Sequence, residues 1–76
     1  RRGILSRGND TWIATKVRTL MFANDEIAAN QVKVVVENGV VYLMGIVTET
    51  EGDTAANVAR NVVGVTKVIK VFEYLT

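Results

Sequence analysis

The stretch that decides the fold is residues 32–47, VKVVVENGVVYLMGIV, with Asn38-Gly39 at its centre. Valines alternate before this dipeptide and apolar residues follow it. Asn-Gly is the pair that two-residue hairpin turns prefer, because both positions adopt positive φ. Such a turn places Val36 opposite Val41 and Val34 opposite Leu43, which makes one face of the hairpin wholly apolar. The stretch therefore predicts two antiparallel strands with a fixed register.

The other face of this hairpin is also more apolar than a water-facing sheet usually is. It pairs Lys33 with Met44, and its apolar positions are Val35, Tyr42, Met44 and Ile46. Because this apolar surplus needs a cover, we treat these four residues as a candidate partner face.

A helix is predicted before the hairpin, over about residues 10–22. Asn9 or Asp10 can cap its first turn, and apolar residues then recur at helical spacing. These residues are Ile13, Val17, Leu20 and Met21. The preceding residues 1–8 show no periodicity and predict a lead-in or interdomain linker without regular structure, so the domain is expected to occupy residues 9–76. The chain opens without an initiator Met, which is typical of a segment of a longer protein.

A second helix is predicted after the hairpin, over about residues 51–63. Its start carries two alternative capping boxes, Thr48 with Glu51 and Thr50 with Asp53. Its apolar stripe is built from Ala55, Val58, Ala59 and Val62. Gly64 is expected to end it in the left-handed conformation.

A third strand is predicted over residues 65–75, with Val68, Phe72 and Tyr74 facing inward. The connection from the second strand through the second helix is long enough for a right-handed crossover to a parallel strand. The fold class is therefore α+β, a two-layer α-β-β-α-β sandwich with two helices on one face of a three-stranded mixed sheet.

Composition excludes most catalytic and metal chemistry. The 76 residues contain neither Cys nor His, so thiolate or imidazole metal sites, disulfides and cysteine or serine–histidine nucleophiles cannot form. The acidic group Glu49, Glu51 and Asp53 lacks the spacing of a calcium loop. We expect a protein that is not an enzyme and uses no metal or cofactor. A nucleic-acid role is not expected either, because the chain lacks the Gly-x-x-Gly loop and paired sheet aromatics of RNA-binding domains.

The first helix carries a tryptophan outside its apolar stripe. With Ile13 at zero, Trp12 falls at about 260°, Lys16 at about 300° and Thr19 at about 240°, whereas the core stripe centres near 25°. Such a tryptophan either covers the edge of the core or binds a partner such as a membrane interface. Residues 1–20 hold five basic side chains against one acidic side chain, which suits an anionic surface.

The chain resembles the BON domain family from Asn9 onward. The resemblance rests on Asn38-Gly39-x-Val41-x-Leu43-x-Gly45-x-Val47 and on Gly64-Val65-x-x-Val68. More narrowly, Asn9-Asp10-Thr11-Trp12-Ile13, Thr15-Lys16-Val17-Arg18 and Leu43-Met44-Gly45-x-Val47-Thr48-Glu49 are similar to the second BON domain of dual-BON outer-membrane lipoproteins of Gram-negative bacteria.

This resemblance implies a lipid-anchored protein at the periplasmic face of the outer membrane. It implies that the first helix binds an anionic phospholipid such as phosphatidylglycerol and so supports outer-membrane integrity. The residues that the resemblance assigns to lipid binding are Asn9, Asp10, Thr11, Trp12, Ile13, Thr15, Lys16 and Thr19. The alternative is a protein-interaction module whose open sheet face docks an upstream BON domain or an outer-membrane protein.

Overall fold

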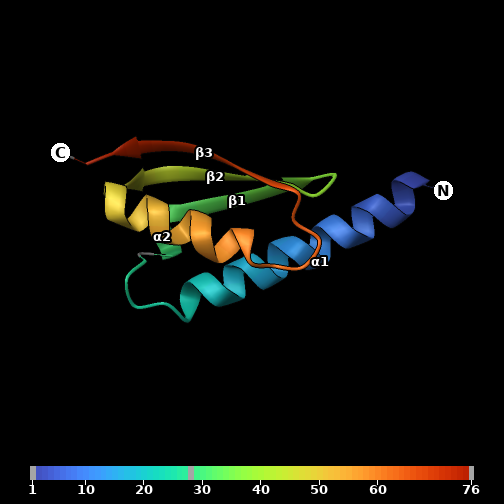
Figure 1. Ribbon diagram of the computed structural model, residues 1–76, viewed down its shortest axis with the longest axis horizontal. Helices are drawn as coiled ribbons and strands as arrows, with labels where there is room; N and C mark the ends of the chain where they lie inside the picture. Colours follow the sequence, from blue (N-terminus) through green and yellow to red (C-terminus); the bar gives the residue numbers. More distant parts are fainter. Residues whose placement is uncertain (1, 28, 76) are drawn as a thin grey trace.

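The computed structural model describes residues 2–27 and 29–75. Its elements follow in the order α1 (Arg2–Phe22), a 3₁₀ turn η1 (Ala29–Gln31), β1 (Val32–Glu37), β2 (Val40–Val47), α2 (Glu49–Arg60) and β3 (Lys67–Tyr74). Both helices lie on the same side of the sheet (Figure 1). The predicted α-β-β-α-β sandwich is confirmed, with η1 as the one described addition.

The sheet is mixed and has the strand order β1-β2-β3. β1 and β2 are antiparallel in the predicted register, with Val34 opposite Leu43 and Val36 opposite Val41. Asn38 has φ 53° and Gly39 has φ 81°, as a two-residue hairpin turn requires. β3 is parallel to β2, so the expected crossover through α2 is confirmed.

The core lies between the helices and the inner face of the sheet. Its fully or almost fully buried side chains are Ile13, Val17, Met21, Val34, Val41, Leu43, Val47, Ala55, Ala56 and Ala59. The alanines let the axis of α2 lie close to the sheet, and Gly52 of the same helix is in contact distance of the rings of Phe72 and Tyr74. Val68 and Phe72 pack against this core, and Tyr74 meets Phe72 edge-on with ring centroids 6.1 Å apart. The inward face predicted for β3 is therefore confirmed.

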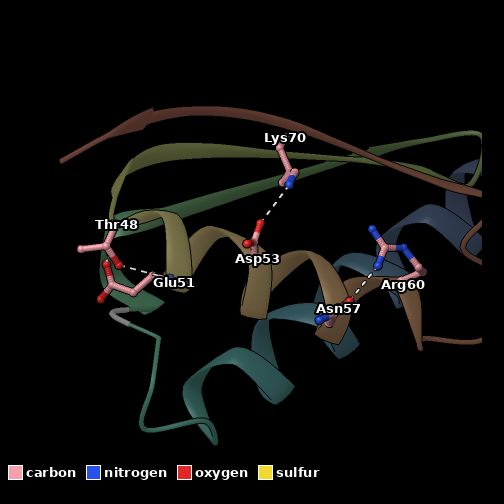
Figure 2. Close-up of polar contacts among 6 residues, drawn as sticks. All are labelled: Thr48, Glu51, Asp53, Asn57, Arg60 and Lys70. Carbon is pink, nitrogen blue, oxygen red and sulfur yellow. Dashed lines mark hydrogen bonds and ion pairs between the residues drawn. The ribbon is translucent and has the colours of Figure 1, made fainter. Parts of the chain in front are cut away.

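α2 begins with the capping box formed by Thr48 and Glu51 (Figure 2). The Glu51 amide donates to Thr48 Oγ1 at 3.1 Å, and the Thr48 amide donates to Glu51 Oε1 at 2.9 Å. The alternative box, Thr50 with Asp53, is not used. Asp53 instead accepts a hydrogen bond from Lys70 Nζ at 3.1 Å, which raises the pKa of that amine and ties α2 to β3.

α2 ends earlier than the sequence predicted. Its last residue is Arg60 and its C-cap is Asn61, whose side-chain amide donates to the Asn57 carbonyl oxygen at 3.0 Å. Arg60 also donates to Asn57 Oδ1 at 2.7 Å (Figure 2). Gly64 has φ 99°, but it lies in the turn beyond the helix. The prediction of its conformation was right and the prediction that it ends the helix was wrong.

α1 begins at Arg2 rather than near Asp10. The chain contains no proline, and Arg and Leu favour a helix, so the helix can continue through residues that were expected to have no regular structure. Asp10 does not cap it. Its carboxylate accepts hydrogen bonds from the hairpin turn, at 2.8 Å from the Asn38 amide and 3.1 Å from the Gly39 amide.

Gly45 is the glycine that the sheet tolerates least well when it is replaced. Its φ is +142°, and a Cβ atom there would lie 2.0 Å from the Gln31 carbonyl oxygen. We expect Gly45→Ala to lower the free energy of unfolding by about 3 kcal/mol or more, because the backbone of η1 must move. Chemical denaturation followed by far-UV circular dichroism measures this loss.

Gly52→Ala is the matched control. A Cβ atom there would meet the rings of Tyr74 and Phe72 at 3.0 and 3.1 Å, and side chains yield more easily than backbone. Alanine also favours a helix over glycine by about 1 kcal/mol. We expect a net change within about 1 kcal/mol. Equal stability of Gly45→Ala and the wild type would contradict the steric argument.

Candidate functional site

Burial of one stripe of α1 turns the opposite side of the helix to solvent. Ile13 and Val17 are fully buried, whereas Trp12 keeps 49 % of its surface exposed. The predicted position of Trp12 outside the core is thus confirmed. We define the outer face of α1 as its exposed residues around this indole, which are Thr11, Trp12, Thr15, Lys16 and Thr19.

Two threonines of the outer face, Thr15 and Thr19, donate their hydroxyl hydrogens to the helix itself. Thr15 Oγ1 donates to the Thr11 carbonyl oxygen at 3.0 Å, and Thr19 Oγ1 donates to the Thr15 carbonyl oxygen at 2.9 Å. The hydroxyl oxygens keep lone pairs that can accept further hydrogen bonds. These two threonines therefore place small, weakly polar side chains on the helix face of the indole.

The positive charge nearest to Trp12 along the described helix is Lys16. It follows the indole by four residues, so the two side chains are neighbours on one helix face. Arg18 has a different role, because its Nη2 donates to the Val34 carbonyl oxygen at 3.2 Å. This bond holds its guanidinium against β1, at the edge of the sheet. Sequence patterns gave no signal for this contact.

The eight residues that the resemblance assigned to lipid binding do not form one surface. Ile13 has no exposed area and belongs to the core. Asp10 is bonded to the hairpin turn. The Asn9 side chain lies outside the part of the chain that the structure describes. The remaining five residues are those of the outer face.

The open face of the sheet is a second exposed surface. Val35, Tyr42 and Met44 are partly exposed there, and Ile46 is 51 % exposed. The parallel register adds β3 residues beside them, Ile69 next to Tyr42 and Val71 next to Met44. Sequence analysis missed these two residues, because it could not predict the strand order.

The described residues also line a hollow outside these two surfaces. A shallow hollow of about 660 Å³ lies between the end of α1 and α2, lined by Leu20 and Val58 and flanked by Asp25 and Glu26. Within residues 2–27 and 29–75 no three acidic side chains gather closely enough to hold a metal ion. In the same part of the chain, no helix combines the length and apolar character of a bilayer-crossing segment.

Comparison with known proteins gives a family match over most of the chain. The BON domain model matches residues 9–76. A 21 kDa hemolysin of Actinobacillus pleuropneumoniae is 50 % identical over 66 residues, and the outer membrane lipoprotein DolP of Haemophilus influenzae is 47 % identical over 66 residues. Each match covers 87 % of this chain and 34 % of the relative. The chain thus spans about a third of the length of these curated relatives.

Trp12 and Ile13 are adjacent in α1, but Trp12 lies on the outer face and Ile13 lies in the core. We expect Trp12→Ala to lower the free energy of unfolding by only about 1–2 kcal/mol, because about half of the side chain is already in water. We expect Ile13→Ala to lower it by about 2–4 kcal/mol, because it leaves a cavity in the core. Urea denaturation followed by circular dichroism measures both. A loss at Trp12 as large as that at Ile13 would show that the indole serves the core.

Proposed function

This chain belongs to the BON domain family, and we propose that it is the second BON domain of an envelope lipoprotein related to DolP. In this proposal the outer face of α1 binds anionic phospholipid at the periplasmic face of the outer membrane and thereby supports outer-membrane integrity. The Haemophilus influenzae relative is an outer membrane lipoprotein, which supports this location.

The observation that carries the proposal is the half-exposed Trp12 with Lys16 one turn away. Indole rings favour the boundary between apolar and polar media, because one part of the ring is apolar and its N–H needs a polar partner. An ammonium beside the ring attracts the phosphates of anionic lipids. The threonines of the outer face add little bulk, so the ring can approach the headgroups.

The expected affinity is low. Burying the exposed half of an indole, about 120 Å², contributes about 3 kcal/mol. Lys16 adds about 1 kcal/mol near an anionic leaflet. A total of about 4 kcal/mol corresponds to a dissociation constant of about 1 mM. Such a helix orients a protein that another anchor holds, which fits the two-signal rule for peripheral membrane proteins and a lipidated relative.

A binding role also fits the composition of the chain. The chain has no Cys or His and therefore no thiolate or imidazole for nucleophilic or metal chemistry, and the proposed function includes no catalysis and no cofactor. Anionic phospholipid is the proposed ligand.

The first test replaces the indole with a negative charge. We expect Trp12→Glu to abolish sedimentation with phosphatidylglycerol vesicles at millimolar lipid, because the substitution removes the apolar contact and adds repulsion from the phosphates. Wild-type binding should weaken as salt rises, because salt screens Lys16 from the leaflet.

Tyr42→Glu is the matched control for charge and for general damage. It places the same carboxylate on the open sheet face, on the opposite side of the sheet from α1. We expect it to bind the vesicles as the wild type does. Normal vesicle binding by Trp12→Glu would exclude the outer face as the contact.

A second candidate function is supported by the open sheet face. We propose that this apolar surface, with Ile46 and Val71 each about half exposed, docks an upstream BON domain or an outer-membrane protein. The two functions are compatible, because they use opposite sides of the domain.

The docking function predicts the reverse response to the same two variants. We expect Tyr42→Glu to weaken docking to the upstream domain in the full-length protein, because it buries an unpaired charge in an apolar contact. Trp12→Glu should leave docking intact. Limited proteolysis or small-angle scattering of the full-length protein measures the loss. Unchanged docking in Tyr42→Glu would argue against this face.

A further inference from the structure

The Asp10 carboxylate occupies the anion-binding concavity of the hairpin turn. Asn38 and Gly39 have successive positive φ values, 53° and 81°. Their two N–H groups converge on the two carboxylate oxygens, at 2.8 and 3.1 Å. Successive backbone N–H groups in a turn form a nest that binds anions, and hydrogen bonds to a charged acceptor are stronger than neutral ones. Asp10 therefore ties α1 to a turn that lies 28 residues later in the chain.

This tie lies two residues before Trp12. At about 100° per residue, Asp10 and Trp12 point about 160° apart around the helix axis. The carboxylate therefore faces the sheet side while the indole lies on the outer face. An acid beside a surface for anionic lipid would normally oppose binding. Here its charge is held by two amide dipoles on the far side of the helix.

We propose that Asp10 is the positioning residue of the outer face: by binding the Asn38–Gly39 amides it fixes the helical turn that presents Trp12. The effect on lipid binding rests on the proposed function, whereas the effect on Trp12 itself does not. Arg18, which donates to the Val34 carbonyl oxygen, ties the same helix to β1 further along. In the segment before Arg18, which includes Trp12, the Asp10 carboxylate binds the hairpin turn through two hydrogen bonds.

The test uses the sign of the change in lipid binding. If Asp10 were only a negative charge near the leaflet, Asp10→Ala would increase binding to phosphatidylglycerol vesicles about fivefold. If Asp10 is instead a positioning residue, Asp10→Ala should bind the vesicles less well. We expect Asp10→Ala to decrease binding at least about threefold, although the variant carries one negative charge less. Increased or unchanged binding would overturn the proposal.

Two further variants provide the controls. Asp25→Ala removes the same charge from an exposed position in the loop after α1, and we expect its binding to equal or exceed that of the wild type. Asp10→Asn keeps one carbonyl oxygen as an acceptor for one of the two turn amides. We expect it to fall between the wild type and Asp10→Ala. If Asp10→Ala does not fold, vesicle binding by Asp10→Asn provides the test. Weaker binding than the wild type supports the proposal, and equal or stronger binding overturns it.

A lipid-free measurement separates this proposal from the proposed function. Trp12 is the only tryptophan, so its fluorescence anisotropy reports the mobility of this one side chain. We expect lower anisotropy in Asp10→Ala and faster hydrogen exchange at the Asn38 and Gly39 amides. Loss of vesicle binding by the wild type would overturn the proposed function alone. Unchanged anisotropy and exchange in Asp10→Ala would overturn the positioning role, whatever the vesicles show.

Discussion

Burial of a single stripe of α1 against the sheet is the constraint on which the rest of the structure depends. Ile13, Val17 and Met21 have at most 1 % of their surface exposed. Because side chains follow each other at about 100° around a helix, this burial leaves Trp12 and Lys16 no inward position. The core therefore determines which residues form the outer face of α1, and the Asp10 carboxylate adds a polar contact to the hairpin turn two residues before Trp12.

The two-layer architecture leaves two sides of the domain open for different contacts. Both helices cover the inner face of the sheet, so the outer face of α1 and the open sheet face point in opposite directions (Figure 1). One surface combines an indole with an ammonium group. The other is mostly apolar, with Tyr42 and Met44 on the central strand and the half-exposed Ile46 and Val71 beside them. A domain of this shape has a separate surface for each of the two proposed contacts.

Sequence patterns predicted those features of the fold that depend on neighbours in the chain. Asn38-Gly39 determined the hairpin register, and helical spacing identified both apolar stripes. Features that depend on contacts between residues far apart in the sequence could not be predicted from these patterns. Asp10 has the residue type of a helix cap, yet its partners lie at the hairpin turn, and no local pattern distinguishes the two roles. The start of α1 was missed because residues 1–8 show no apolar periodicity, although Arg and Leu favour a helix and no proline interrupts it. For the candidate surfaces, helical periodicity predicted that Trp12 is exposed. The position of Val71 on the open sheet face could not be predicted, because it depends on the strand order.

The measurement that tests the account most directly is a titration of the isotope-labelled domain with phosphatidylglycerol-containing micelles, followed residue by residue by NMR. Amide shifts should cluster at Trp12, Lys16 and Thr19, together with a shift of the indole N–H. The open sheet face should stay unchanged. Shifts that cluster at Tyr42, Met44 and Ile46, with an unperturbed indole, would contradict the assignment of α1 as the lipid-binding element.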